Sequence, residues 1–145
     1  MELLVTGVVI LLLFSILNVF LTHYQGQAER DLVDLTLRNM RTGLRLHVAT
    51  LSVEGKRSQI VQLADSNPVT WLGQFPADYL GALDNAPPRE TRGWYFDQST
   101  RELAYRPQSS GFPGGKWQEL RWRVESLPGQ DTGARIGPET SKPQD

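Results

Sequence analysis

The feature that most constrains this chain is an uncharged, strongly apolar stretch at residues 3–22, LLVTGVVILLLFSILNVFLT. A helix rises 1.5 Å per residue, so about 20 residues span roughly 30 Å, the thickness of the hydrocarbon layer of a bilayer. Within such a layer a lone segment pairs all of its backbone polar groups only as a helix. The stretch therefore predicts a transmembrane helix, and we expect residues 1–22 to form a membrane anchor.

A cleaved secretory signal is the main alternative to a retained anchor. Such a signal has a positively charged start, an apolar run of about 7–15 residues and a small-residue cleavage site. This chain starts with Met1 and Glu2, its apolar run is longer, and residues 21–24 contain no small-residue site. A retained anchor is favoured. Its few small or polar residues indicate either contact with another helix or a tolerated minority: Thr6, Gly7, Ser15 and Asn18.

Residues 27–53 contain no proline and repeat apolar residues at helical spacing. The repeating residues are Val33, Leu37, Met40, Leu44, Val48 and Leu51. Steps of three and four residues place these side chains on one face of a helix, which we expect to pack on the following domain. No strong helix breaker separates this segment from the anchor. We therefore expect one continuous helix, with Gly26 as the point where an interruption would fall.

The segment after the helix contains capping and turn signals. Gly55 suits a left-handed C-cap that ends the long helix, and Ser58 suits the N-cap of a short helix over residues 59–64. The proline that follows Asn67 ends this second helix, because the residue before a proline is pushed out of the helical region. Residues 69–83 predict a loop with one helical turn.

Runs of aromatic and aliphatic residues in the second half of the chain predict strands. Residues 93–97 and 102–106 predict a β-hairpin, and residues 116–124 predict a third strand. Residues 128–145 contain too few apolar side chains to offset the entropy of ordering, so they predict a disordered tail. The sequence thus predicts an α+β fold, a long helix on a small antiparallel sheet, organised as an anchor (1–22), an α+β domain (23–127) and a tail (128–145).

Residues suited to catalysis or metal binding are sparse. The chain has no cysteine, which excludes disulfides, thiolate metal sites and cysteine nucleophiles. His23 and His47 lie too far apart along the helix for a shared metal, which needs a spacing near three or four. The glycine-rich residues 111–115 lack the Lys-Ser/Thr pair of a phosphate loop, and a net charge of −1 gives no general attraction to nucleic acid. We expect no enzyme activity, no cofactor and no nucleic-acid partner.

As a string, residues 2–12, ELLVTGVVILL, resemble the start of the type IV pilins and the type II secretion pseudopilins. Proteins of this family continue the apolar segment into a helix that lies half in the membrane and half on a sheet. The resemblance in organisation covers residues 2–53. The predicted hairpin resembles one in some minor pseudopilin-like proteins, nearest the accessory components of mannose-sensitive-haemagglutinin-type pilus systems.

The resemblance implies a role in subunit assembly for Glu2, Leu3, Leu4 and Val5. In the family the corresponding acid meets the amino terminus of a neighbouring subunit, and the apolar helices bundle in the filament core. The resemblance further implies a non-enzymatic, single-pass protein of the bacterial inner membrane with a periplasmic domain, carried in some members into a filament. Its implied partners are pilin or pseudopilin subunits and their assembly platform.

Two features depart from the family pattern. Members have a short basic leader that ends in glycine and is followed by phenylalanine, whereas here Met1 directly precedes Glu2. Basic residues also follow the anchor and none precedes it, so the positive-inside rule places the domain in the cytoplasm. A basic leader upstream of Met1 would remove both departures, and we expect that translation begins upstream; otherwise the chain is an unprocessed pilin-like protein. The alternative function is a bitopic envelope scaffold whose domain binds a partner protein.

Overall fold

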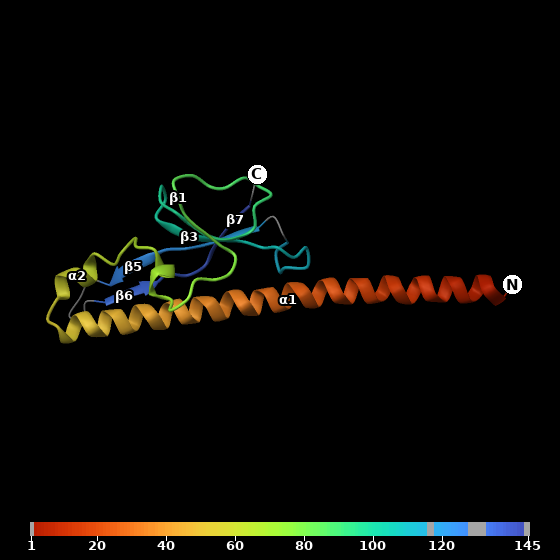
Figure 1. The fold of residues 1–145 in the computed structure, drawn as a ribbon, viewed down its shortest axis with the longest axis horizontal. Coiled ribbons are helices and arrows are strands. Elements are labelled where there is room, and N and C mark those ends of the chain that lie inside the picture. The colour runs from red at the N-terminus through yellow and green to blue at the C-terminus, as the bar shows by residue number, and fades with distance from the viewer. Residues whose placement is uncertain (1, 116–117, 128–132, 144–145) are drawn as a thin grey trace.

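One long helix, α1, organises the whole molecule (Figure 1). The structure, a computed structural model, describes residues 2–115, 118–127 and 133–143. Helix α1 (Glu2–Val53) begins with a half that projects freely and ends beneath a small sheet domain. The other elements, in chain order, are α2 (Arg57–Val61), the 3₁₀ helix η1 (Pro68–Trp71), β1 (Tyr79–Leu83), β2 (Gly93–Asp97), β3 (Glu102–Arg106), β4 (Gln118–Trp122), β5 (Val124–Leu127), β6 (Gly133–Ile136) and β7 (Thr140–Pro143).

The continuity of α1 confirms the predicted single helix, and Gly26 does not interrupt it. The predicted C-cap is also confirmed, because Gly55 has a φ of +73°. The N–H of Gly55 donates to the carbonyl of Ser52, and the N–H of Lys56 donates to that of Leu51, which are the two bonds of a Schellman motif. The predicted cap at Ser58 is wrong, since α2 begins at Arg57 without a side-chain cap bond.

Two sheets form the domain. The larger has the strand order β1-β2-β3-β4-β7, and the smaller pairs β5 with β6. β1 is parallel to β2, and the other pairs are antiparallel. The predicted hairpin is confirmed with the same bounds, as β2 and β3. Within the predicted third strand, β4 ends at Trp122 and β5 begins at Val124; residues 116 and 117 lie outside the described residues.

The structure differs from the prediction in two segments. Residues 79–83, predicted as part of a loop, form β1. Residues 133–136 and 140–143 form β6 and β7, although residues 128–145 were expected to be a disordered tail; residues 128–132 and 144–145 lie outside the described residues. β7 joins the edge of β4 through main-chain pairing, which does not require apolar side chains. The α+β class is confirmed.

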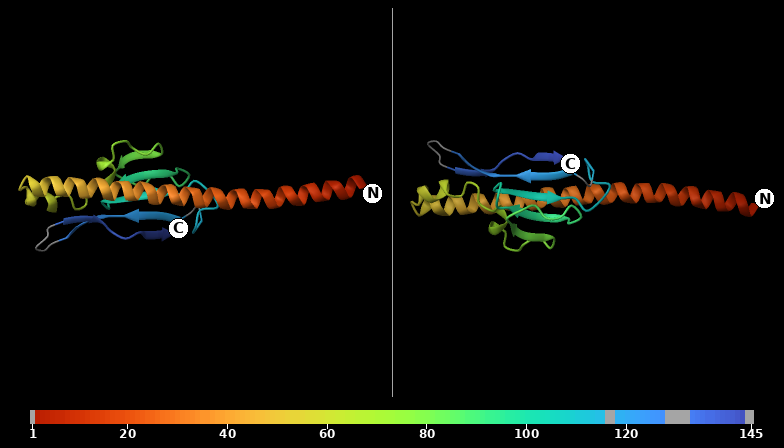
Figure 2. Two further views of the ribbon diagram at one scale, coloured as in Figure 1. Left: turned by 90° about the horizontal axis from the view of Figure 1, so that it is seen from below. Right: turned by 90° about the horizontal axis from the view of Figure 1, so that it is seen from above.

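The core lies between α1 and the larger sheet. The predicted stripe on α1 is confirmed, because Val33, Leu37, Met40 and Leu44 are at most 2% exposed. Facing them are inward side chains of β2, β3 and β4, chiefly Trp94, Phe96, Leu103, Tyr105, Leu120 and Trp122. The domain straddles the helix, with the green segments around β1 on one side and the blue strands β5–β7 on the other (Figure 2).

Candidate assembly surface

The four residues for which the family resemblance implies a role in assembly lie at the free end of α1. Leu3, Leu4 and Val5 are 89%, 75% and 63% exposed, and Glu2 is exposed beside them. With the described part of the chain, the Glu2 carboxylate forms no ion pair. The fold therefore keeps these four residues together on one turn of helix, and it places them far from the sheet domain (Figure 1).

The free half of α1 satisfies its own polar groups. The side chains of Thr6, Ser15, Asn18 and Thr22 donate to carbonyl oxygens one turn earlier, at 2.8–2.9 Å. Nothing lies within 4 Å of a Cβ added at Gly7. This half is long and apolar enough to cross a membrane, and its most apolar window has no residue buried in the protein. An apolar surface of this extent needs lipid or other helices around it.

Four further exposed apolar residues lie along the packed half of α1, on the side opposite the core, with the polar residues Asn39 and Thr42 between them. They are Leu32, Leu35, Leu46 and Val53, which are 63%, 53%, 70% and 89% exposed. At 3.6 residues per turn these positions share one side of the helix, and we call them the outer seam. The outer seam was not predicted from the sequence, because the inward stripe is the stronger apolar pattern in this segment.

Helix α1 and the loop after β3 are joined at two neighbouring points. Glu29 Oε1 accepts hydrogen bonds from the Tyr105 hydroxyl at 2.7 Å and the Gln108 N–H at 2.6 Å, while Oε2 accepts from the Ser109 N–H at 2.8 Å. Burial and the bond to Glu29 raise the pKa of Tyr105. One turn earlier, the backbone of Gly111 lies so close to Gly26 that a Cβ there would overlap its carbonyl.

A cavity of about 830 Å³ lies between α1 and the segment that precedes β1. Its walls include Leu32, Trp94 and Tyr105, and two carboxyl groups line it, those of Glu29 and Asp78. We call it the acidic cavity. The amide Nε2 of Gln108 donates to Asp78 Oδ2 at 3.2 Å, and burial raises the pKa of Asp78. In the part of the chain that the structure describes, no cationic side chain pairs with either carboxyl group.

Three arginines lie along α1 on the side opposite the acidic cavity. Arg38, Arg41 and Arg45 are spaced by three and four residues, so they share one side of the helix, and we call them the arginine row. None of the three forms an ion pair with a described residue. Arg41 and Arg45 also border a small cavity of about 190 Å³ beside β6.

No protein-family model, curated protein or solved structure matches this chain. Its function is therefore argued from these surfaces.

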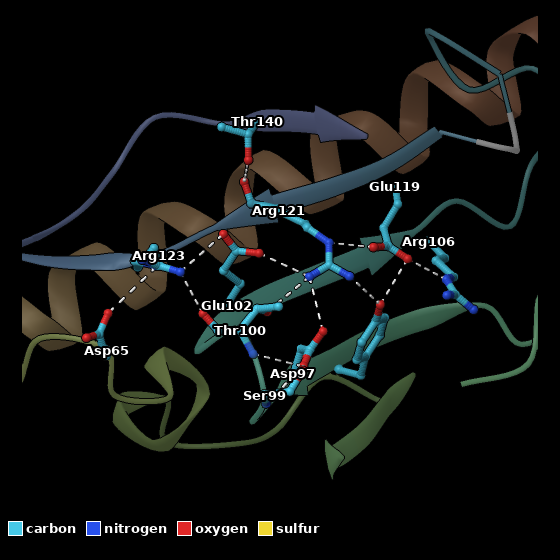
Figure 3. A network of polar contacts seen from close by, with 11 residues as sticks. Asp65, Asp97, Ser99, Thr100, Glu102, Arg106, Glu119, Arg121, Arg123 and Thr140 are labelled. Carbon is cyan, nitrogen blue, oxygen red and sulfur yellow. Dashed lines mark hydrogen bonds and ion pairs between the residues drawn. The ribbon is translucent and has the colours of Figure 1, made fainter. Parts of the chain in front are cut away.

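The sheet face turned away from α1 carries a network of charged side chains (Figure 3). Arg121 pairs with Asp97 at 3.2 Å, with Glu102 at 3.0 Å and with Glu119 at 2.6 Å. Glu119 also pairs with Arg106 at 2.6 Å and accepts a hydrogen bond from the Tyr95 hydroxyl at 2.9 Å. Burial, together with the charge of Glu119, raises the pKa of Tyr95 to about 12. These groups bind one another across β2, β3 and β4, which makes the network structural.

The described side chains form no cluster suited to a metal ion. No group of three or more His, Asp or Glu residues among them could hold a metal ion. His23 and His47 are both exposed on α1, separated by about 36 Å of helix at 1.5 Å per residue. The arginine row was not predicted, although its spacing of three and four residues is visible in the sequence. The sequence contains no signal for the acidic cavity, because Asp78 reaches Glu29 only through the fold.

Proposed function

We propose that this chain is a membrane-anchored, non-enzymatic subunit or assembly factor of a filament of the type IV pilus or type II secretion kind. The observation that carries the proposal is α1. Its first half is apolar and free, while its second half holds the sheet domain and still exposes the outer seam. A plain anchor would not need exposed apolar residues along the domain.

The same helix can have two successive environments in this role. Before assembly, residues 3–22 lie in the bacterial inner membrane, with the domain in the periplasm. After assembly, the same apolar surface packs against the helices of pilin or pseudopilin subunits, which replace the lipid. Both environments remove the exposed apolar side chains from water, at roughly 25 cal/mol for each Å².

Glu2 is the residue that distinguishes assembly from simple anchoring. A carboxylate at the end of an apolar helix is costly in a water-free environment unless a cation pairs with it. In the filament we assign that cation to the amino terminus of a neighbouring subunit, as the family resemblance implies. Leu3, Leu4 and Val5 then supply the apolar contacts around this pair.

Glu2→Ala tests the proposed function. We expect the variant to insert into membranes normally, because the apolar stretch is unchanged, and to lose most of its co-assembly with pilin-family subunits. Cells that express these subunits are fractionated, and the chain is measured by immunoblot in membranes and in sheared filaments. Thr6→Val is the matched control on the same helix half, since the Thr6 hydroxyl only bonds the Glu2 carbonyl at 2.9 Å.

Unchanged co-assembly of Glu2→Ala contradicts the role of Glu2. The alternative function is a bitopic envelope scaffold. The acidic cavity supports this alternative, because a partner protein could bind there. If the chain is a scaffold, the Glu2→Ala variant still binds the partner protein, and even the unmodified chain is absent from filaments.

A further inference from the structure

The acidic cavity and the arginine row carry opposite charges and lie on opposite sides of the same helix. At 3.6 residues per turn, the α1 residues that line the cavity point about half a turn away from the arginine row. The neighbouring elements support this arrangement. The acidic cavity is lined by the segment before β1, whereas Arg41 and Arg45 lie beside β6. β1 and the segments around it lie on one side of α1, and β5–β7 lie on the other (Figure 2).

Neither surface is paired with an opposite charge from the described residues. Among the described residues, neutral groups donate to both carboxylates: the Tyr105 hydroxyl and the Gln108 and Ser109 N–H groups donate to Glu29, and the Gln108 amide donates to Asp78. On the other side, like charges spaced by three and four residues repel each other along a helix. None of these three arginines forms an ion pair with a described residue, because Asp34, one turn before Arg38, pairs with Arg30 instead.

We propose that the arginine row of one copy of this chain docks against the acidic cavity of a second copy. The contact is heterologous, because each copy contributes a different side and leaves its other surface for a further copy. The proposal rests on the proposed function, since side-by-side, parallel packing of α1 helices is the arrangement in which the two sides meet.

The positions of the two surfaces fix the geometry of the contact. The cavity centres near residue 30 of α1 and the row near residue 41, so parallel copies are displaced by about 16 Å along the helix axis. A lipid headgroup is a poor occupant for the row, because Arg38 lies about 24 Å beyond the end of the apolar stretch. A second copy brings both charges at once, which favours it over a separate acidic partner.

The absence of cysteine allows a direct crosslinking test on the full chain. One population carries Thr42→Cys beside the arginine row, and a second carries Ala77→Cys at the rim of the acidic cavity. Both populations are reconstituted in the same membranes and treated with a short bismaleimide. We expect mixed dimers, no dimers from either population alone, and a ladder of multimers from a chain that carries both cysteines.

Ser52→Cys is the matched control for Thr42→Cys. Each residue is exposed on α1 and bonds only to a carbonyl one turn earlier, at 2.8 Å for Ser52 and 3.0 Å for Thr42. Ser52 lies about 15 Å further along the helix, so the proposed displacement leaves it without a partner at Ala77. Equal crosslinking from Ser52→Cys would overturn the proposed register.

Charge variants test the chemistry of the contact. Asp78→Asn keeps an acceptor for Gln108 and removes the charge, so we expect it to fold and to lower the yield of mixed dimers about tenfold. Arg41→Asp in the copy that carries Thr42→Cys should lower the yield of mixed dimers to a similar extent. Combining it with Asp78→Arg in the copy that carries Ala77→Cys should restore this yield. The thermal unfolding midpoint of each variant verifies that it folds.

Three outcomes would overturn the proposal. These are an Asp78→Asn yield equal to that of the parent, dimers from a single population, and crosslinking of Ala77→Cys only to another pilin-family subunit. The proposed function fails separately. A chain that forms mixed dimers but never enters filaments keeps the contact and loses the function, whereas Glu2-dependent co-assembly without mixed dimers keeps the function and overturns the contact.

Discussion

At the scale of single residues, Gly26 has a role that differs from the one its residue type suggested. Glycine inside a helical pattern indicates a weak point, and the sequence analysis placed a potential interruption there. In the structure the helix is unbroken, and the missing side chain instead lets the backbone of Gly111 approach. The contact lies one turn before Glu29, so both features hold the same loop to α1.

Gly26→Ala should therefore destabilise the domain even though alanine is the better helix former. A Cβ at this position overlaps the Gly111 carbonyl, and moving the loop also disturbs the bonds of Gln108 and Ser109 to Glu29. We expect a loss of about 1–3 kcal/mol in the free energy of unfolding. Thermal unfolding in detergent measures the loss, and hydrogen exchange at the two loop amides locates it.

Gly73→Ala is the control for this prediction, because nothing lies within 4 Å of a Cβ at Gly73. This change should stay within about 0.5 kcal/mol of the parent. If Gly26→Ala unfolded at the same temperature as Gly73→Ala, the close contact would not contribute to stability.

At the scale of elements, the charged network links side chains of β2, β3 and β4 on the sheet face away from α1, in addition to the main-chain pairing of these strands. Burial alone would raise the pKa values of Asp97 and Glu119, but hydrogen bonds and the charges of the arginines outweigh burial and lower both. Both carboxylates bond Arg121, whose side chain is only 11% exposed. The strands are therefore held by charges that depend on pH.

The stability of the domain should fall as the pH is lowered below about 5. Because the folded pKa values of Asp97 and Glu119 lie below the unfolded ones, the unfolded chain binds more protons in acid. Their contribution is present above the unfolded pKa values, near 4, and is lost as the pH falls through the folded values. Unfolding midpoints measured from pH 7 to pH 2 test this dependence.

Arg121→Met should weaken both the domain and its response to acid. Removing this cation leaves the buried Asp97 carboxylate without an ion-pair partner among the described residues and takes one cation from Glu119, which costs about 3–5 kcal/mol near neutral pH. The acid-dependent loss should shrink, because the ionised forms of Asp97 and Glu119 are less strongly favoured. Arg135→Met is the control, since the exposed Arg135–Glu125 pair contributes at most about 1 kcal/mol. Equal midpoints for the two variants would show that the network does not join the strands.

The elements that sequence predicted correctly are those with their own repeating pattern. The stripe from Val33 to Leu51 predicted the buried face of α1, and aromatic runs predicted β2 and β3. β1 and β7 could not be predicted in this way, because each is added at a sheet edge by main-chain pairing, which needs no repeating side-chain pattern. The acidic cavity could not be predicted either, since it joins α1 to residues roughly 40–80 positions further along the chain.

At the scale of the whole molecule, the proposed function requires the sheet domain to lie in the periplasm. The basic residues after the apolar stretch argue for the opposite orientation by the positive-inside rule. A reporter that is active only in the periplasm, fused after Asp145, keeps β6 and β7 intact and measures the orientation. We expect it to be active, and a matched fusion to a reporter active only in the cytoplasm to be silent. The reverse pattern would exclude filament assembly from the periplasmic side.

The unbroken passage of α1 from its apolar half into the domain has a mechanical consequence. No flexible joint separates the two parts, and the contacts at Gly26 and Glu29 fasten the domain just beyond the apolar stretch. In a bilayer, a tilt of the apolar half of α1 therefore tilts the domain by the same angle, with the membrane surface as the pivot. The arm from Gly26 to Val53 is about 40 Å long, so a tilt of about 20° moves its far end by roughly 14 Å. Bilayer thickness, acting through helix tilt, thereby sets where the domain can reach.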